Sequence, residues 1–329
     1  MNNLKKIGLT ALAGCLAVTS VQATTLTASG SASIGFGGAD KGTSANGFYM
    51  NDEVTFSGSG ELDNGWNVTL SMQLDNNENL GTKNFDNRSI TIDMGDAGTF
   101  AFGGHGLDSV VGGVDDVMPT AYGETWDIIS NTVDNGGVTS TASTLFGAIG
   151  SASSNNMMRY DNTTAVEGLK ISASYVPSGT GEVESSVDYG LEYTGYEGLT
   201  LGYAMGENNA AGGTGNTDND TMYVKYAYGP VTVGYQKSEI DGNTANATDE
   251  WDAFGITYAV SDSISVGYAE STYNAGDKAT DQENSNLSVS YTAGGMTLAA
   301  GFAEEKNRGG LTTAVNDVKG YDISLAFAF

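Results

Sequence analysis

The last nine residues of the chain read Tyr321-Asp322-Ile323-Ser324-Leu325-Ala326-Phe327-Ala328-Phe329. Large apolar side chains alternate with small or polar ones, which is the period-two pattern of a β-strand with one apolar and one polar face. This pattern predicts a strand that ends at a membrane interface, with Phe329 as its anchor and assembly signal. An edge strand of a soluble sheet would alternate in the same way, so the rest of the chain has to decide.

The same alternation recurs along the whole chain. Between Trp66 and Leu74 every second side chain is large and apolar, and the side chains between them are polar. Runs of this kind indicate strands that are buried on one face only. Sixteen of them are found, at residues 26–36, 54–62, 66–74, 90–94, 100–102, 158–160, 169–175, 187–193, 199–205, 222–228, 231–235, 254–258, 264–268, 287–291, 296–302 and 321–329. The sequence therefore predicts an all-β fold.

The connections between these segments alternate in length. Short turns such as Asp63-Asn64-Gly65 and Gly229-Pro230 alternate with long polar loops such as 104–155 and 238–250, and a somewhat longer turn is expected at 161–168. All three prolines fall in connections, as a hydrogen-bonded ladder requires. Short turns at one end and long loops at the other are typical of membrane barrels. The pattern predicts a 16-stranded antiparallel transmembrane β-barrel.

Aromatic residues support the same interpretation, because they gather at both ends of the predicted strands. Strands that run toward the long loops finish with Phe36, Phe102, Tyr175, Tyr203, Tyr235, Tyr268 and Phe302. Strands that run toward the short turns finish with Tyr160, Tyr193, Tyr228, Tyr258, Tyr291 and Phe329. Two such girdles match the two interfaces of a bilayer, where rings with a polar edge are best solvated.

The amino terminus has the order of a secretory signal. A short basic segment and an apolar stretch too short to cross a bilayer precede the small-x-small site Val21-Gln22-Ala23. We expect a signal peptide at 1–23 and a barrel domain at 24–329. A lipoprotein signal that ends at Cys15 is the alternative. Cleavage after Ala23 would remove the only cysteine, and with it disulfide and thiol chemistry.

The charge balance of the chain is strongly acidic. The predicted signal contains Lys5 and Lys6, so 11 basic and 40 acidic residues remain after cleavage, a net charge of −29. A field of this sign repels nucleic acid and attracts cations. The mean hydropathy of −0.21 would suggest a soluble protein. Membrane barrels give low values too, because only every second residue meets lipid.

With these features together, the chain resembles the trimeric general porins of Gram-negative bacteria, most closely the alphaproteobacterial type. The resemblance rests on the even strand count, the terminal Phe329 and one outsized loop after the fifth strand, at 104–155. It implies a homotrimer in the outer membrane, in contact with lipid and lipopolysaccharide and assembled by the barrel assembly machinery through the last strand. It also implies passive diffusion of ions and small hydrophilic solutes, through a lumen that the third loop enters and constricts.

The family pattern sets acids of the third loop against basic residues of the barrel wall. The loop acids of this chain are Asp108, Asp115, Asp116, Glu124, Asp127 and Asp134. The inward parity yields three basic wall residues, Arg159, Lys170 and Lys225, whereas the direction of Arg88 stays open. It also yields the wall acids Glu53, Glu61, Asp75, Asp188, Glu192 and Asp322. The acids outnumber the bases, so we expect a negative lumen that prefers cations.

Three other functions fit the sequence less well. A barrel enzyme would need a histidine, and His105 is the only one, with Ser109 nearby in sequence. A lone loop histidine is more often a polar residue of the lumen, so catalysis is not expected. Runs such as 215–220 resemble calcium loops but lack EF-hand spacing, so we expect no cofactor beyond weak binding of divalent cations such as calcium. A secreted acidic adhesin or surface-layer-like protein would explain the composition, but it predicts a fixed short repeat, and none is found.

Overall fold

The computed structural model describes residues 25–41, 47–75, 85–125, 128–129, 155–177, 185–209, 216–242, 248–276, 278, 280–312 and 317–329. The predicted signal peptide lies outside these residues. Within them, the regular structure is almost entirely β-strand, with short 3₁₀ turns at η1 (Gly95–Ala97), η2 (Gly112–Val114) and η5 (Arg308–Gly310). None of the helices in this part of the chain is both long and apolar enough to cross a bilayer.

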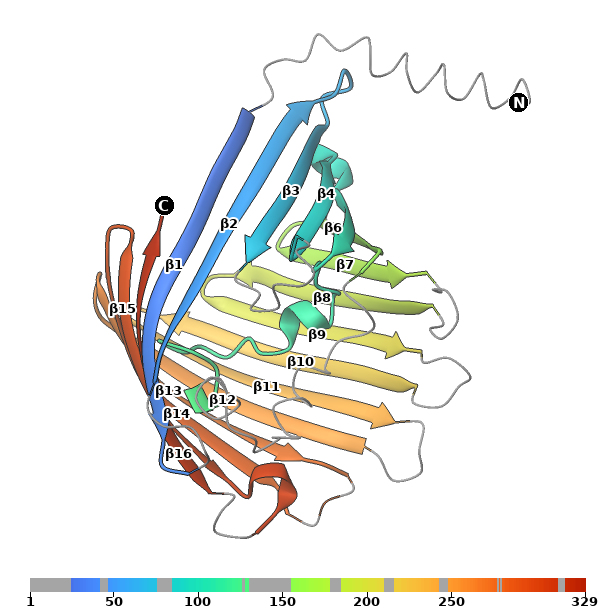
Figure 1. The fold of residues 1–329 in the computed structure, drawn as a ribbon. Helices are drawn as coiled ribbons and strands as arrows, with labels where there is room; N and C mark the ends of the chain where they lie inside the picture. The colour runs from blue at the N-terminus through green and yellow to red at the C-terminus, as the bar shows by residue number, and fades with distance from the viewer. Residues whose placement is uncertain are drawn as a thin grey trace, which may run out of the picture.

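Sixteen strands follow one another around a single sheet (Figure 1). They are β1 (Thr25–Ala39), β2 (Gly47–Glu61), β3 (Asn67–Asp75), β4 (Asn87–Asp93), β5 (Thr99–His105), β6 (Met157–Val166), β7 (Leu169–Val176), β8 (Ser186–Tyr196), β9 (Leu199–Asn208), β10 (Thr217–Tyr228), β11 (Val231–Gly242), β12 (Thr248–Ser261), β13 (Ile264–Asn274), β14 (Gln282–Ala293), β15 (Met296–Lys306) and β16 (Val318–Ala328). Each pairs antiparallel with its sequence neighbours, which confirms the predicted number and order of strands.

The sheet closes on itself because β1 pairs with β16. Their register runs from Ser31 opposite Ala328 to Ala39 opposite Gly320. Phe329 extends the seam, since its N–H donates to the carbonyl of Gly30 at 3.0 Å and its carbonyl accepts the Gly30 N–H at 2.9 Å. A closed barrel leaves no unpaired sheet edge, which is the condition for a β-structure to cross a bilayer.

The two faces of the barrel divide the side chains as the alternation predicts. Large apolar residues such as Leu70, Tyr203 and Phe302 are exposed on the outer face. The residues between them point inward and are small or polar, and in β7 to β16 many of them are buried. This is the arrangement of a protein whose outside meets lipid and whose inside is polar.

The boundaries of the predicted loop 238–250 are wrong, because the strands continue past the aromatic girdle. β11 ends at Gly242, and β12 begins at Thr248. Beyond Tyr235 the outward side chains change from apolar to charged, in the order Lys237, Glu239 and Asp241. The backbone pairing of β11 with β12 continues through these charged residues. The end of the apolar alternation therefore marks the edge of the bilayer and not the end of the strand.

The turn predicted at 161–168 is also wrong in its extent. β6 continues to Val166, with a register shift between Asn162 and Val166. The Oδ1 atom of Asn162 accepts the N–H groups of Thr164 and Ala165 at 2.9 and 2.8 Å, which stabilises this irregular part of the strand. One consequence is that Asp161 belongs to the barrel wall, where sequence analysis had placed a turn.

Candidate functional site

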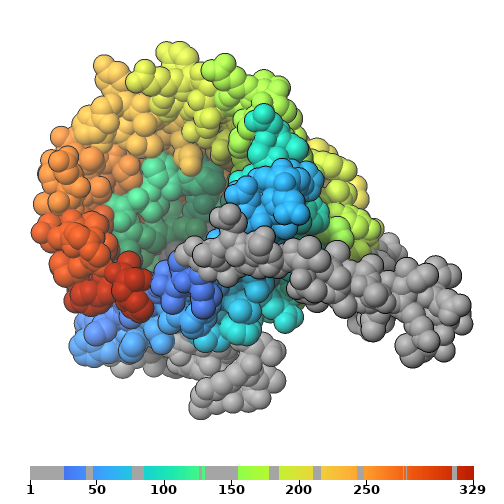
Figure 2. Space-filling view, turned by 90° about the horizontal axis from the view of Figure 1, so that it is seen from above, coloured from blue at the N-terminus to red at the C-terminus, as the bar shows by residue number. Residues whose placement is uncertain are grey.

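The described part of the connection between β5 and β6 runs along the inner wall of the barrel. Its backbone N–H groups donate in turn to inward side chains of β7, β8, β11 and β14. Val110 binds Ser174 Oγ at 3.0 Å, Val111 binds Asp188 Oδ2 at 3.1 Å, Val117 binds Gln236 Oε1 at 2.9 Å and Ala121 binds Ser288 Oγ at 3.2 Å. Figure 2 shows this segment, in green, inside the ring of strands.

The far end of this segment is bound at the closing seam. Tyr122 and Tyr49 both donate their hydroxyl groups to the fully buried carboxylate of Asp322 on β16. Burial, and then the hydrogen bond to Asp322, raise the pKa of Tyr122 to about 12, so its hydroxyl keeps the proton that it donates. Asn286 Nδ2 donates to three consecutive carbonyls, those of Tyr122, Gly123 and Glu124, at 3.0 to 3.3 Å.

These contacts divide the inner surface into two parts. We call the inner faces of β6 to β16, which the segment follows, the covered wall. We call the inner faces of β1 to β4 the open wall, which the segment reaches at Tyr49 of β2, through the Asp322 carboxylate that Tyr49 shares with Tyr122. Its side chains form a polar chain across the strands. Ser31 Oγ and Gln73 Nε2 donate to the two carboxylate oxygens of Glu53 at 3.1 and 2.5 Å, and Asn87 Nδ2 donates to Gln73 at 2.6 Å.

No lysine or arginine of the described residues projects inward from the open wall. Arg88, whose direction was undecided, has the same parity in β4 as Ile90, is exposed, and lies opposite the outward Met72 of β3. Glu53, Glu61 and Asp75 have the inward parity that sequence analysis gave them. The open wall is therefore hydroxyl- and amide-rich, with carboxylates as its charged groups.

Four of the predicted loop acids lie in the described segment. Asp108 is exposed, and Asp115, Asp116 and Glu124 are partly exposed. Two of these carboxylates also shape the backbone, because Asp115 Oδ1 accepts the N–H of Asp116 at 2.9 Å and Asp116 Oδ1 accepts the N–H of Met118 at 2.7 Å. The other two predicted loop acids, Asp127 and Asp134, lie outside the described residues.

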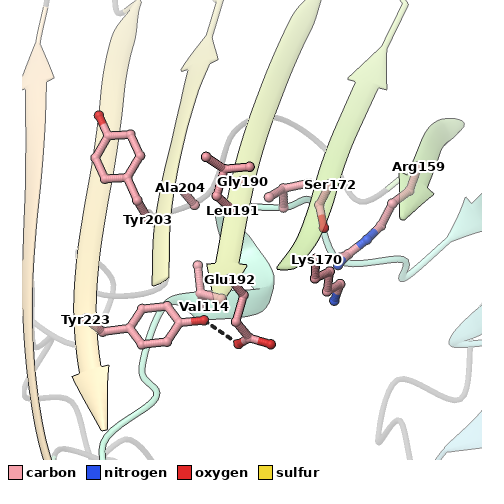
Figure 3. A pocket seen from close by; sticks show the side chains of 11 residues that line it. Val114, Arg159, Lys170, Ser172, Gly190, Leu191, Glu192, Tyr203, Ala204 and Tyr223 are labelled. Atoms are coloured by element: carbon pink, nitrogen blue, oxygen red, sulfur yellow. Dashed lines mark hydrogen bonds between the residues drawn. The ribbon is translucent and has the colours of Figure 1, made fainter. Parts of the chain in front are cut away.

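Two of the predicted basic wall residues are bound to a wall acid that sequence analysis missed. Arg159 Nε lies 2.9 Å and Lys170 Nζ lies 3.4 Å from the carboxylate of Asp161. The Nη1 atom of Arg159 also donates to the backbone carbonyls of Asp108 and Ser109 at 3.0 and 3.2 Å. Arg159 therefore attaches the start of the segment to the wall through these loop backbone carbonyls. Figure 3 shows Arg159 and Lys170 beside each other.

The third basic residue, Lys225, differs from the other two. Among the described residues no carboxylate forms an ion pair with it, and its ammonium group lies 5.8 Å from the centroid of the Tyr223 ring. The Tyr223 hydroxyl donates to Glu192 at 2.6 Å (Figure 3). Lys225 lines a cavity of about 430 Å³ beneath residues 117–120. It is a wall cation with an open aqueous environment.

The buried acids of the covered wall serve the loop. Asp188 and Asp322 are both fully buried, and each accepts a hydrogen bond from the segment. Sequence parity gave their inward direction, but it gave no sign of their partners. Gln236 and Asn286, which hold the segment most extensively, were missed altogether. The available signal was an uncharged amide side chain in the middle of an inward face.

The groups that an enzyme would need are already engaged otherwise. His105 Nδ1 contacts the backbone carbonyl of Asp86, and Ser109 Oγ accepts the N–H of Gly112 at 3.0 Å. Within the described ranges, no cluster of three or more His, Cys, Asp or Glu side chains could hold a metal ion.

A closed sixteen-stranded antiparallel barrel with an apolar exterior and a polar interior belongs to the class of transmembrane β-barrels. A family model described as Gram-negative porin matches residues 8–328, nearly the whole chain. The chain belongs to this family of channel proteins, which places it in the outer membrane. A search of curated protein sequences found no match.

The folds of three solved structures are similar to the fold of this chain. The anion-selective porin from Comamonas acidovorans gives a TM-score of 0.70 at 13% identity, covering 93% of this chain and 100% of that one. OmpT, an outer membrane protein of Vibrio cholerae, gives 0.64 at 15% identity, covering 94% and 100%. A mutant of the Rh. blastica porin gives 0.64 at 15% identity, covering 93% and 100%. At these identities the likeness shows the fold alone.

Proposed function

We propose that this outer-membrane channel conducts ions and small hydrophilic solutes by passive diffusion, that the third loop at 104–155 constricts it, and that it prefers cations. The observation that carries the preference is the open wall. Its inward charges are carboxylates, including Glu53, and the loop acids Asp115 and Asp116 belong to the segment that is bound to the covered wall. A solute that passes between the two meets negative charge on both sides.

The basic residues of the covered wall do not reverse this balance. Arg159 and Lys170 share the carboxylate of Asp161, so one of their two charges is compensated at contact distance. Lys225 contributes one further positive charge beneath the loop. Anion preference, which the name of the Comamonas porin describes for that protein, is the competing function, and it would require the wall cations to dominate.

The test is the zero-current potential of the purified channel in a planar bilayer under a salt gradient. We expect a potential of the sign that cation flow gives. The preference should weaken at high salt, because the Debye length falls from about 10 Å at 0.1 M to about 3 Å at 1 M. A channel that prefers chloride would contradict the charge assignment. A protein that inserts but conducts nothing would contradict the channel function itself.

We also propose that three copies associate through the outer face of β1 and β2. Asp52 on β2 has the same outward parity as Met50 and Val54, and it lies opposite Ala32 of β1. A carboxylate in the apolar band is costly against lipid, whereas a neighbouring subunit could satisfy it. One solved form of OmpT is described as a trimer. Cross-linking of the native protein in membranes tests this association.

Phe329 is proposed as the group that completes the barrel during assembly. Its two backbone hydrogen bonds to Gly30 extend the β16–β1 seam, and its exposed ring is available to lipid at the membrane interface. Recognition of this strand by the assembly machinery, and contact of the outer rim with lipopolysaccharide, belong to the same proposal. Deletion of Phe329 should lower the amount of folded barrel in outer membranes, whereas unchanged amounts would contradict the role.

A further inference from the structure

A row of inward glycines lies on the covered wall directly beneath the loop segment. Its members share the absence of a Cβ at a point where a loop residue touches the sheet. They are Gly190 of β8, Gly206 of β9, Gly234 of β11, Gly255 of β12, Gly267 of β13 and Gly301 of β15. We call this set the glycine row. Glycine inside a strand weakens the strand, and it is a known mark of close approach by another group.

Between β11 and β15 the members of the row lie at or near facing register positions. Gly234 and Gly255 are direct register partners, and Ser288 of β14 lies opposite both Gly267 and Gly301. On β14 the inward Ser288 accepts the N–H of Ala121, so a hydrogen-bonding group fills the position between two glycines. The glycines thus allow the loop to lie close to the sheet. The polar side chains among them accept hydrogen bonds from the loop N–H groups, which buried backbone requires.

The distances show how closely the loop approaches two of these glycines. A Cβ added to Gly255 would lie 2.6 Å from the carbonyl oxygen of Pro119, and one added to Gly267 would lie 2.7 Å from the backbone nitrogen of Ala121. Ordinary non-bonded contacts begin near about 3.5 Å, so the loop backbone would have to move by roughly 1 Å. The wall cannot yield in the other direction, because both glycines belong to hydrogen-bonded strands of the closed sheet.

We propose that the glycine row consists of positioning residues that set the distance between the third loop and the wall, and thereby the open cross-section of the channel. This inference rests on the proposed conducting function and deepens it. A methyl group at Gly255 or Gly267 displaces the loop toward the axis of the lumen. The displaced loop narrows the aqueous path, and pore diameter governs conduction.

The row also predicts a ranking among its members. At Gly255 and Gly267 the conflict is with loop backbone, so the loop itself has to move. At Gly301 the conflict is with Cδ1 of Ile128, the far end of a flexible side chain, at 2.0 Å. A rotation of that side chain can relieve it. Gly255→Ala and Gly267→Ala should therefore change conduction more than Gly301→Ala.

The experiment compares single-channel conductance of the wild type and these variants in planar bilayers. We expect conductance to fall by roughly 1.5-fold or more for Gly255→Ala and Gly267→Ala. Gly58→Ala in β2 controls for the replacement of a strand glycine as such, because Gly58 has the outward parity of its partner Leu70 and an added Cβ there meets nothing within 4 Å. Heat-modifiable gel mobility establishes that each variant is folded. Folded Gly255→Ala and Gly267→Ala channels with the conductance of the wild type would overturn the proposal.

A compensating pair separates loop displacement from any general effect on the strand. A Cβ on Gly190 would lie 2.5 Å from Cγ1 of Val110, and the change Val110→Ala removes that atom. Gly190→Ala should lower conductance, and Gly190→Ala with Val110→Ala should restore it. If the conductance of the double variant stays as low as that of Gly190→Ala, the proposal is wrong. It is also wrong if Gly58→Ala lowers conductance as much as the row variants do. Should either backbone-conflict variant fail to fold, this pair decides alone.

The two proposals fail in different ways. A wild-type barrel that inserts and carries no current contradicts the channel function. A wild-type barrel that conducts, with row variants that conduct identically, contradicts only the positioning role of the glycine row.

Discussion

The covered wall and the open wall belong to one sheet, but their side chains follow different rules. On the covered wall, groups such as Asp188, Gln236 and Asn286 are buried, and each binds the loop. On the open wall, Glu53 and Gln73 are partly exposed and bind each other across strands. One wall has the chemistry of a protein core and the other that of a hydrated surface.

This difference assigns separate tasks to the two walls. Contacts on the covered wall determine where the loop lies, and a lost contact there leaves a polar group without a partner. Charges on the open wall face water, and a lost contact there is replaced by solvent. Shape should therefore depend on the covered wall, and selectivity on the open wall together with the loop acids.

The largest effect is expected where neither inner wall is involved. Leu70 of β3 faces outward, and its neighbour Ser71 faces the lumen from the open wall. Leu70→Arg should destabilise the barrel by about 2–4 kcal/mol if the position meets the middle of the bilayer. Ser71→Arg should leave stability nearly unchanged and reduce cation preference. Denaturant titrations in lipid vesicles measure the first effect. Equal destabilisation by both would reverse the assignment of faces.

A matched pair of glutamines compares the two walls directly. Gln236 is fully buried, accepts the N–H of Val117 and donates to the carbonyl of Val114 at 2.7 Å. Gln236→Leu should cost about 1–3 kcal/mol, because these buried loop groups lose their partner. Gln73→Leu on the open wall should cost less, since water replaces the lost bonds to Glu53. The measurement is the free energy of unfolding of the two variants. A larger loss of stability in Gln73→Leu than in Gln236→Leu would refute the distinction between the two walls.

Selectivity should respond most to the paired loop acids. Changing both Asp115 and Asp116 to Asn removes two charges and retains the Oδ1 acceptors that shape the turn. The zero-current potential should move toward zero, with the folded barrel preserved. The shift should be larger at 0.1 M than at 1 M salt, because screening lengths differ by about threefold. An unchanged potential would mean that other acids set the preference.

The smallest effects are expected from removing a single charge on either wall. The two resulting shifts of the reversal potential should have opposite signs. Glu53→Gln on the open wall should reduce cation preference, whereas Lys225→Gln on the covered wall should increase it. Both replacements keep a polar side chain of similar length. Reversal potentials measured in the same gradient give both signs at once. Shifts in the same direction would show that the field is not divided between the walls as proposed.

Much of the fold was predictable, because strand alternation, turn length and aromatic position are local properties of the sequence. The boundary of β11 was not, since Lys237, Glu239 and Asp241 interrupt the apolar pattern while pairing continues. Asp161 was missed because the register shift in β6 carries no period-two signal.

The candidate site was predictable only in part. Parity gave the inward direction of Arg159, Lys170 and Asp322, because direction follows from alternation within one strand. It could not give the ion pair with Asp161 or the bond from Tyr122, since these depend on how distant segments meet. The glycine row was invisible for the same reason. An inward glycine gains meaning only when the loop that crosses it is known.

The bond between Tyr122 and Asp322 also bears on the order of folding. The two residues are 200 positions apart, and Asp322 belongs to the last strand of the sheet. The loop cannot acquire its final contacts until that strand is in place. Contacts of such long range form slowly, because the chain between them has to be ordered first. Closure of the barrel and shaping of its lumen should thus be a single late event, so that a partly inserted chain has no finished aperture.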